Sequence, residues 1–227
     1  MTPSRPRISA IVPAYNEAEH ISHVLDVLCA YQGFSEIIVV DDGSTDETAR
    51  IVKRYPVTYL HHQPNRGKGY AMDQGVRRAT GDILFFSDAD ILGLTPEVLD
   101  RILGPVVSGS VEMSVGVRGR GIPPVMGILA RIFPVTMLIS GQRALTRRLW
   151  ERLPLFYKKG FRIESGLNYY ARYLGQGLSY TVCTELEQII KEQKYGFWSG
   201  FVRRLGMIYD IIIARGKLSL SSSDDQL

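Results

Sequence analysis

The first part of the chain repeats one pattern: a short apolar run, a polar cluster, then apolar positions at helical spacing. Residues 8–12 form an apolar run, and apolar positions within residues 21–28 recur at i, i+3, i+4 and i+7, as on one face of a helix. Further apolar runs lie at residues 36–40, 57–60 and 82–86, and polar residues follow each of them. The pattern predicts four strands with helices between them.

Alternating strands and helices predict an α/β fold with an open, mainly parallel sheet and helices on both faces. In such sheets, ligands bind beyond the carboxyl ends of the strands, which is where the polar clusters stand. We expect Ser44 or Thr45 to cap the helix around residues 49–52, because a hydroxyl oxygen can accept from the first N–H groups of a helix.

Composition narrows the class of protein. A chain of 227 residues suits one domain with a sizeable core. The formal net charge of +4 is too small and dispersed for a nucleic-acid binder, but it suits anionic ligands or a membrane surface. Cys29 and Cys183 lie in apolar surroundings and predict buried thiols in a reducing cytosol. We expect none of the four histidines to bind a metal.

Two segments bear on localisation. Residues 1–7 are polar and contain proline, unlike a signal peptide. Prolines and Arg131 interrupt the apolar segment 122–139, which is therefore not a membrane span. We expect a cytoplasmic protein that is not integral to a membrane by its own chain.

Near the C-terminus, apolar residues from Trp198 to Ile212 recur at helical spacing, with arginines on or near the other side. They predict a basic amphipathic helix over residues 197–218, suited to an anionic membrane surface at the cytoplasmic face or to a second subunit. Packing against the sheet is the alternative. Residues 219–227 are polar and predicted to be disordered.

Two aspartates follow the last of the four apolar runs. In a strand, residues i and i+2 point to one face, so the carboxylates of Asp88 and Asp90 can converge on one ligand. Two such carboxylates repel each other unless a cation joins them, and Mg²⁺ or Mn²⁺ shared with a substrate diphosphate is the usual reason for the pair. A strand-end turn, where Asp bonds nearby N–H groups, is the alternative.

The segment Asn-Arg-Gly-Lys-Gly at residues 65–69 precedes the predicted helix that ends at residue 79. Its glycines let the backbone approach a diphosphate, and Lys68 supplies a mobile positive charge. A lysine between glycines is common in loops, so the segment gains weight only from its place before this helix and the aspartate pair.

Four segments, in this order and spacing, resemble glycosyltransferase family two: Pro13–Glu17, Val40–Asp46, Asn65–Gly69 and Asp88–Asp90. The resemblance implies a GT-A fold with a Rossmann-like nucleotide-binding half, a UDP- or GDP-hexose as donor, and a divalent metal. Within the family the chain is most similar to the polyprenyl- or dolichol-phosphate mannosyl- and glucosyltransferases. We expect one domain over residues 1–218, with a donor half at 8–92 and an acceptor half at 93–196.

The resemblance implies roles around the donor. Asp41 and Asp42 would accept hydrogen bonds from the base or the ribose. Glu17 would accept from the ribose or orient its loop, although it also favours the positive end of its helix. Lys68 would meet the diphosphate, and Asp88 and Asp90 would hold the metal. The other implied donor contacts are Pro13, Ala14, Tyr15, Gly43, Ala89 and Lys194, the last in a basic loop that closes over the diphosphate.

On the acceptor side, residues 113–117 predict another strand, followed by a dibasic loop that suits an anionic group. The resemblance to the polyprenyl-phosphate transferases places Arg118, Arg131 and Ser140 near the acceptor phosphate. It also implies that Arg143 lies in an acceptor-site turn and contacts sugar or phosphate. The mostly apolar segment around Arg131 is either a core helix or a lipid contact.

Glu164 opens a predicted helix that ends near Gly175. The resemblance implies a general base acting on an acceptor hydroxyl, although Glu-Ser stands here in place of the family's commoner Glu-Asp. A carboxylate favoured by the helix dipole is the alternative. An already ionised phosphate acceptor would need no strong base.

The sequence thus predicts an inverting, metal-dependent hexosyltransferase with Asp90, Lys68 and Glu164 in catalysis. Its first predicted acceptor is a polyprenyl phosphate or another membrane lipid, and a soluble acceptor such as phosphoglycerate is the alternative. A nucleotidyltransferase, from another class, would be expected to carry a glycine-rich loop after the first strand, where Pro13–Glu17 stands instead. A non-catalytic sugar-nucleotide sensor is a third hypothesis, which the retained aspartates and Lys68 disfavour.

Overall fold

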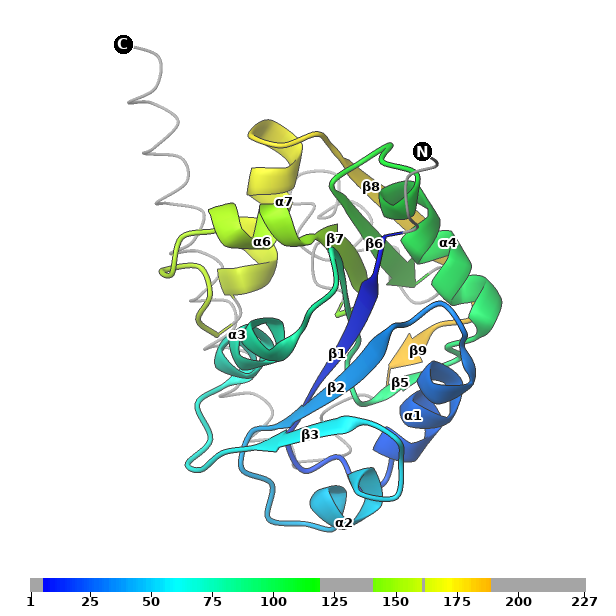
Figure 1. Cartoon of the computed structure of the whole chain (residues 1–227), viewed down its shortest axis with the longest axis vertical. Coiled ribbons are helices and arrows are strands. Elements are labelled where there is room, and N and C mark those ends of the chain that lie inside the picture. The colour runs from blue at the N-terminus through cyan, green and yellow to red at the C-terminus, as the bar shows by residue number, and fades with distance from the viewer. Residues whose placement is uncertain (1–5, 119–140, 161, 189–227) are drawn as a thin grey trace, which may run out of the picture.

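A computed structural model of the chain describes residues 6–118, 141–160 and 162–188 (Figure 1). Their strands form a large sheet and a small one. The large sheet contains β1 (Ile8–Ala14), β2 (Glu36–Asp41), β3 (Thr58–His61), β4 (Ile83–Phe86), β6 (Met113–Arg118), β7 (Arg143–Thr146) and β8 (Leu178–Cys183), and the small one pairs β5 (Ile91–Leu92) with β9 (Glu187–Gln188).

The seven-stranded sheet has the order β3-β2-β1-β4-β7-β6-β8. β1 pairs in parallel with β2 and β4, β2 with β3, and β6 with β8, while β7 runs antiparallel to β4 and β6. The predicted open, mainly parallel sheet is confirmed. Strand order reverses between β1 and β4, and a crevice at the carboxyl ends of the strands is expected at such a reversal.

Helices cover both faces of the large sheet, as predicted. In Figure 1, α1 and α4 lie on one face, and α3, α6 and α7 lie on the other. The described helices are α1 (Ile21–Ala30), α2 (Thr48–Val52), α3 (Lys68–Arg78), α4 (Pro96–Val107), α6 (Arg147–Arg152) and α7 (Arg162–Tyr173).

Alternation along the strands builds two cores. Ala10 and Val12 of β1 face α1 and α4, whereas Ile11 faces α3. In β4, Phe85 belongs to the first core and Phe86 to the second. Because strands buried on both faces read as continuous apolar runs, the sequence pattern identified them without showing which side chain faces which layer.

The cap predicted for α2 is wrong. The helix begins at Thr48 after Glu47, and neither Ser44 nor Thr45 caps it. The hydroxyl of Ser44 instead accepts from the backbone N–H of Asn16 at 2.9 Å. The backbone N–H of Thr45 donates to Oδ1 of Asn16 at 2.8 Å. The two residues expected to cap the helix are therefore hydrogen-bonded to Asn16, in the loop after β1, instead.

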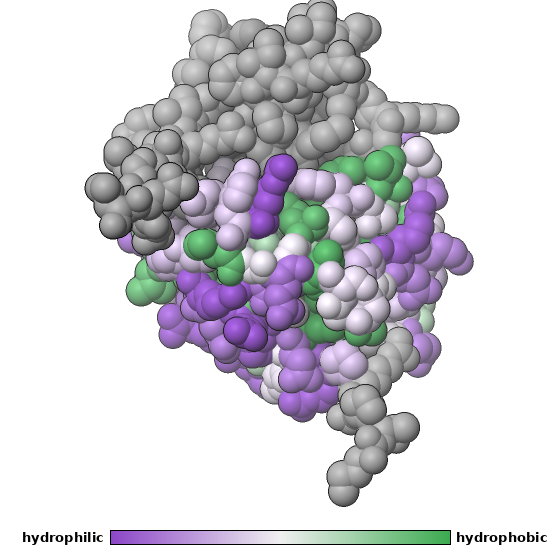
Figure 2. Space-filling view, turned by 90° about the horizontal axis from the view of Figure 1, so that it is seen from above, coloured by the Kyte–Doolittle hydropathy of each residue, from purple (hydrophilic) through white to green (hydrophobic). Residues whose placement is uncertain are grey.

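The surface seen from above Figure 1 mixes hydrophilic side chains with smaller hydrophobic groups (Figure 2). Across the described ranges, no helix is both long and apolar enough to cross a membrane. The predicted helix 197–218 and the tail 219–227 lie outside the residues that the structure describes.

Candidate active site

The polar clusters expected at the carboxyl ends of the strands meet at one edge of the large sheet. Parallel pairing of β1, β2 and β4 brings the segments that follow them to that edge. The register aligns Ala14 with Asp41, and the backbone N–H of Asp42 donates to the carbonyl of Ala14 at 2.8 Å. The base-side residues predicted from the sequence, Pro13, Ala14, Tyr15, Glu17, Asp41, Asp42 and Gly43, therefore come from two adjacent strand ends.

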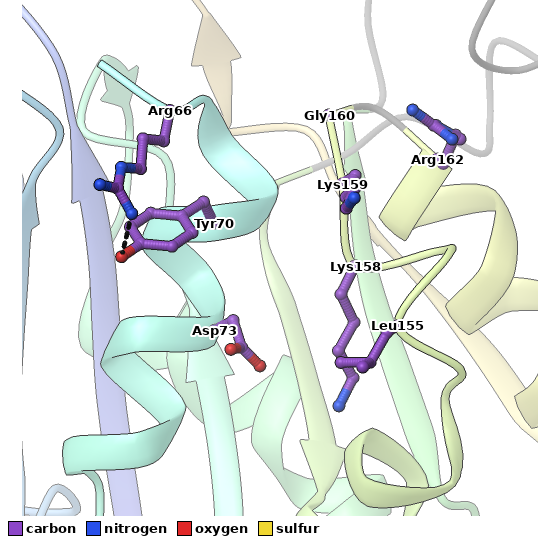
Figure 3. A pocket seen from close by; sticks show the side chains of 8 residues that line it. All are labelled: Arg66, Tyr70, Asp73, Leu155, Lys158, Lys159, Gly160 and Arg162. Carbon is purple, nitrogen blue, oxygen red and sulfur yellow. Dashed lines mark hydrogen bonds between the residues drawn. The ribbon is translucent and has the colours of Figure 1, made fainter. Parts of the chain in front are cut away.

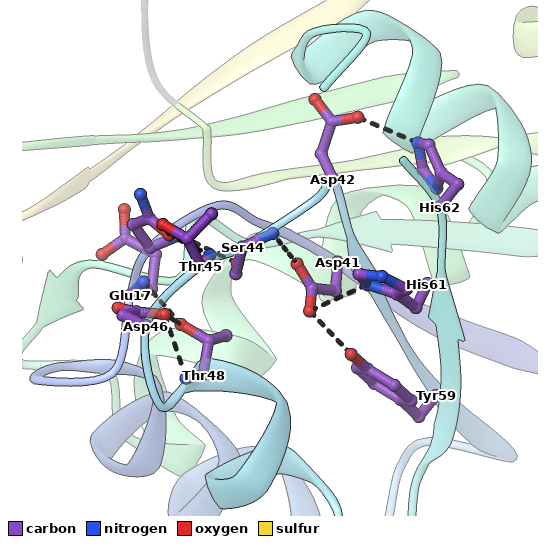
Figure 4. Close-up of polar contacts among 11 residues, drawn as sticks. Glu17, Asp41, Asp42, Ser44, Thr45, Asp46, Thr48, Tyr59, His61 and His62 are labelled. Carbon is purple, nitrogen blue, oxygen red and sulfur yellow. Dashed lines mark hydrogen bonds and ion pairs between the residues drawn. The ribbon is translucent and has the colours of Figure 1, made fainter. Parts of the chain in front are cut away.

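The end of β2 is held by the end of β3 (Figure 4). Asp41 is fully buried, and its carboxylate accepts from the phenol of Tyr59 at 2.6 Å and from the backbone N–H of Ser44 at 2.8 Å. Nδ1 of His61 lies 3.3 Å from the same carboxylate. Burial acts to raise the pKa of Asp41, but these donors outweigh it and hold the pKa below its ordinary value. Asp41 is therefore a charged acceptor with partners on both oxygens.

Asp42 orders the glycine-lysine loop. Its two carboxylate oxygens accept from the backbone N–H groups of Arg66 at 2.9 Å and Gly67 at 2.7 Å. Nε2 of His62 lies 2.9 Å from Oδ1 of Asp42 (Figure 4). Gly67 has φ of 89°, a left-handed conformation that favours glycine, and α3 begins directly after it. Asp42 thus fixes the point from which Lys68 projects.

The loops after β1 and β2 are also joined to each other. Asn16 has φ of 54°, in the left-handed region that asparagine tolerates, and it bonds both Ser44 and Thr45. The backbone N–H of Glu17 donates to the hydroxyl of Thr48 at 2.8 Å. These bonds make the two loops one rigid wall beside the strand ends.

Lys68 lies between two carboxylates. Its Nζ is 2.8 Å from Oδ1 of Asp88 and 2.9 Å from Oε1 of Glu164. Burial acts to lower the pKa of Lys68, but the two carboxylates outweigh it and raise the pKa above its ordinary value. The lysine stays charged and is held in place, so the prediction of a mobile charge is wrong for this structure.

Arg143 is the second cation of this group. It is fully buried, and burial lowers its pKa, while Glu164 and Asp88 oppose that shift. The sequence placed Arg143 in a turn, but it lies in β7, paired with Phe86 of β4 and Val115 of β6. Two cations, Lys68 and Arg143, therefore lie near two carboxylates, Asp88 and Glu164. The four side chains come from α3, β7, the segment after β4 and α7.

The two aspartates after β4 do not lie in a strand. β4 ends at Phe86, Asp88 follows in an irregular segment, and Asp90 lies in a turn before β5. The alternating-face argument is therefore wrong, although Asp88 still contacts Lys68. A Cβ on Gly141 would lie 2.0 Å from Oδ2 of Asp88, so any larger residue at position 141 would clash with the carboxylate in this position.

The residues present fit a divalent cation that is completed by a substrate. Within the described ranges, no group of three or more His, Cys, Asp or Glu residues could hold a metal alone. Mg²⁺ and Mn²⁺ bound with nucleotides typically use one or two carboxylates and take further oxygens from phosphates. Asp88 and the 5% exposed Asp90, with Ala89 between them, offer such a carboxylate pair.

Several predicted site residues lie outside the residues that the structure describes: Arg131 and Ser140 on the acceptor side, and Lys194 on the donor side. For Arg118, the structure describes the backbone at the end of β6. Glu164 lies in the first turn of α7, as the sequence predicted, and is 2% exposed.

Sequence reasoning missed the partners of the predicted aspartates. Tyr59, His61 and His62 hold Asp41 and Asp42, and Gly141 makes room for Asp88. The signal for the first three is their place at the end of a strand that pairs in parallel with β2, where His61 is in register with Asp41. The sequence gives no signal for Gly141, because the need for glycine arises only where its segment lies against Asp88, which is distant in the chain.

Comparison with known proteins agrees with this arrangement. The sequence matches the family model "Glycosyl transferase family 2" over residues 9–160. It is 33% identical to the dolichol-phosphate mannosyltransferase of Pyrococcus furiosus over 118 residues, 49% of this chain and 33% of that protein. It is 28% identical to the glucosyl-3-phosphoglycerate synthase of Mycolicibacterium smegmatis over 191 residues, 70% of this chain and 62% of that protein. The chain therefore spans only part of the length of either relative.

Solved structures share the fold. A crystal structure of glucosyl-3-phosphoglycerate synthase from Mycobacterium tuberculosis, in complex with Mn²⁺, uridine diphosphate and glucosyl-3-phosphoglycerate, gives a TM-score of 0.75. The match covers 93% of this chain and 80% of that chain at 23% sequence identity. At that identity, the likeness establishes a common architecture and nothing finer.

Proposed function

Because the chain belongs to glycosyltransferase family two, we propose that it transfers a hexose from a nucleoside-diphosphate sugar to an acceptor, with inversion at the anomeric carbon. The observation that carries the proposal is the contact of Lys68 with Asp88 and Glu164, next to the turn that contains Asp90. These groups lie at the edge of the sheet where ligands of such folds bind. The nucleotidyltransferase alternative has no support from the family match.

The proposed reaction is one in-line displacement. An acceptor oxygen forms a bond to the anomeric carbon while the bond from that carbon to the diphosphate oxygen breaks. The electron pair of the broken bond leaves with the nucleoside diphosphate. Lys68 would stabilise this developing negative charge, and a charge that is already held in place needs no reorganisation during the reaction.

Asp88 and Asp90 would hold the divalent metal, which supplies further positive charge to the leaving diphosphate. The carboxylates offer oxygen ligands, which Mg²⁺ and Mn²⁺ prefer. Lys68 sits 2.8 Å from Oδ1 of Asp88, so it already compensates part of the negative charge of that pair. Lys194, in the proposed closing loop, would add to it.

The nucleoside would lie against the wall formed by the loops after β1 and β2. Pro13, Ala14 and Tyr15 would flank the base, and Asp41, Asp42 and Glu17 would provide acceptors or orient the loops. The buried network around Asp41 supports a rigid, negatively charged position at the base end of this wall. Asp42 would act through the loop of Arg66 and Gly67 that it orders.

We propose an acceptor that carries a phosphate group, since two relatives of different specificity are named for such acceptors. A polyprenyl phosphate would use its phosphate oxygen as the nucleophile. Phosphoglycerate would use a hydroxyl, whose proton Glu164 would take. The match to the phosphoglycerate enzyme extends over 70% of the chain, against 49% for the mannosyltransferase, and this favours the soluble candidate.

The test is a transfer assay with radiolabelled UDP-glucose and GDP-mannose, each with Mn²⁺. One arm supplies polyprenyl phosphate in detergent micelles, and the other supplies 3-phosphoglycerate. Labelled product in either arm, lost on chelation, supports the proposal. If neither donor yields product with either acceptor or with a lipid extract, and the protein binds no nucleoside diphosphate by calorimetry, the proposed function is wrong.

A further inference from the structure

A cavity of about 520 Å³ has a lining that includes none of the residues grouped around Lys68 (Figure 3). One wall is the start of α3 and the loop before it, with Arg66, Tyr70 and Asp73. The facing wall is formed by residues between the end of α6 and the first residue of α7, namely Leu155, Lys158, Lys159, Gly160 and Arg162. The volume falls within the range typical of small-molecule sites.

The lining is strongly cationic. Arg66, Lys158, Lys159 and Arg162 contribute four positive charges, and the lining carboxylate, Asp73, is already 2.8 Å from Arg77. Among the described residues, neither Arg66, Lys158 nor Lys159 has a carboxylate within salt-bridge distance. A hollow lined by one sign of charge concentrates the field and attracts counter-ions.

Aromatic rings hold the cations here. The guanidinium of Arg66 lies 4.9 Å from the ring centroid of Tyr70, and Nζ of Lys158 lies 5.2 Å from that of Trp150. Arg162 lies 4.8 Å from the ring of Phe156. A ring face orients a cation without cancelling its charge, so the positive potential of the cavity persists.

The two walls are also held at a fixed spacing. A Cβ on Gly69 would lie 2.7 Å from the carbonyl oxygen of Lys158 and 3.0 Å from the backbone nitrogen of Gly160. The first turn of α3 therefore touches the backbone of the opposite wall. The side chain of Lys68, the residue before Gly69, does not line the cavity and reaches Asp88 and Glu164 instead.

We propose that this cavity is a second anion site, which attracts the phosphate group of a small phosphorylated ligand through the positive potential of Lys158, Lys159 and Arg66. A phosphate monoester carries close to two negative charges at neutral pH and three acceptor oxygens, which suits several cationic donors on two facing walls. The ligand is either a soluble phosphate monoester or the phosphate headgroup of a lipid. The proposal does not depend on the proposed sugar transfer.

Binding would join the start of α3 to the segment that leads into α7. These elements carry Lys68 and Glu164, so an anion in the cavity would stabilise the relative position of two elements of the transfer site. The expected signature is a rise of the thermal midpoint with inorganic phosphate, without metal or nucleotide.

The experiment measures binding of inorganic phosphate and glycerol phosphate by calorimetry, in chelator. The double variant Lys159→Gln with Arg66→Gln changes exposed side chains and should weaken binding by about tenfold or more, since charged hydrogen bonds are lost. A second variant, Lys158→Gln, should do the same. Arg54→Gln with Arg148→Gln removes two exposed charges elsewhere and should leave binding unchanged.

Lys68→Met separates the two sites. If it abolishes phosphate binding while the cavity variants retain it, the phosphate binds at the transfer site and the proposal is wrong. The proposal is also wrong if the cavity variants bind phosphate as tightly as the charge control, Arg54→Gln with Arg148→Gln. Flotation with phosphatidylcholine vesicles containing phosphatidic acid identifies the source: loss of flotation in the cavity variants indicates a lipid headgroup, and binding of glycerol phosphate without flotation indicates a soluble ligand.

Discussion

A single lysine organises the centre of the candidate site. Lys68 neutralises charge on Asp88 and Glu164, of which Glu164 is 3% exposed at its side chain. Because its pKa is raised, the stabilisation from these pairs is fully present below the ordinary lysine pKa near about 10.4 and is lost only as the pH rises through the raised value. The pairs therefore persist throughout the neutral range, where any transfer would occur.

Asp90→Asn tests the metal pair. The change keeps the shape of the side chain but removes a charged oxygen ligand, so we expect kcat/KM to fall by about a hundredfold or more even at saturating Mn²⁺. The thermal midpoint should change little, because one of two repelling carboxylates is neutralised. Asp100→Asn, on the exposed side of α4, is the control and should keep normal activity. Full activity of Asp90→Asn, or wild-type activity in excess chelator, would show that no metal acts there.

Asp41 should make stability sensitive to acid. Its pKa is lowered in the folded protein, so its contribution is present above the ordinary carboxyl pKa and is lost as the pH falls through the lowered value. We expect wild type to be more stable than Asp41→Asn at about pH 7, with the difference shrinking below about pH 4. Urea unfolding of both proteins across this range measures it. A difference that stays constant down to about pH 3 would contradict the assignment.

The sequence predicted which charged residues form the site, but it did not predict the secondary structure and the burial of all of them. Asp88, Lys68 and Glu164 stand in motifs with a recognisable order. Arg143 was placed in a turn by the resemblance to the family's acceptor-site turn, whereas the structure has it as the first residue of the four-residue strand β7. Only the assembled sheet, with carboxylates from other elements nearby, explains a fully buried guanidinium there.

At the scale of elements, the first turn of α3 lies in close contact with the backbone of another segment. Gly69 lies in the helix and touches the backbone of the segment before α7. Gly104 lies in α4, and a Cβ there would meet nothing within 4 Å. The two glycines share a helical setting and differ in what surrounds them, so they form a matched pair.

Gly69→Ala should therefore destabilise the protein, although alanine is the better helix former. The added Cβ meets backbone atoms, which cannot move without shifting the opposite wall. Gly104→Ala should change the free energy of unfolding less, because its Cβ would meet no atom within 4 Å outside the neighbouring residues, while Pro105 directly after it offsets the gain in helix propensity. Thermal unfolding of both variants measures these effects. If both glycines respond alike, the close approach of α3 to residues 158–160 is not tight.

Element prediction succeeded where one helix face meets one core. The four apolar positions that predicted the first helix, Ile21, Val24, Leu25 and Leu28, are the buried residues of α1. It failed for the cap of α2, because the hydroxyl of Ser44 bonds a residue 28 positions earlier. Local patterns carry no information about such long-range competition for a polar side chain.

At the scale of the whole molecule, one sheet joins the two predicted halves. β7 inserts antiparallel between β4 of the donor half and β6 of the acceptor half. Alternating strands and helices predicted the parallel part, but the reversed strand has no local signal. We propose that the single domain over residues 1–218 carries donor and acceptor groups on this common frame, so the acceptor half positions Glu164 against Lys68.

The position of Glu164 provides a test of the acceptor that uses the whole site. Oε2 of Glu164 is buried with no hydrogen-bond partner among the described residues, while Oε1 is held by Lys68. If the nucleophile is a hydroxyl, as in phosphoglycerate, Glu164→Gln should lower kcat by about two to four powers of ten, the usual contribution of a positioned base. If the nucleophile is an ionised phosphate oxygen, no proton is removed, and the variant should keep a substantial rate.

The same substitution also weakens the Lys68 ion pair, so donor affinity must be measured beside the rate. Nucleoside-diphosphate binding to Glu164→Gln, by calorimetry, separates a change in Lys68 from a lost base. Arg118→Ala gives the complementary readout, since a phosphate held by that arginine predicts a higher acceptor KM with normal donor affinity. A large loss of kcat in Glu164→Gln, together with a normal acceptor KM in Arg118→Ala and no flotation with anionic liposomes, would rule out the polyprenyl-phosphate candidate and leave the soluble hydroxyl acceptor.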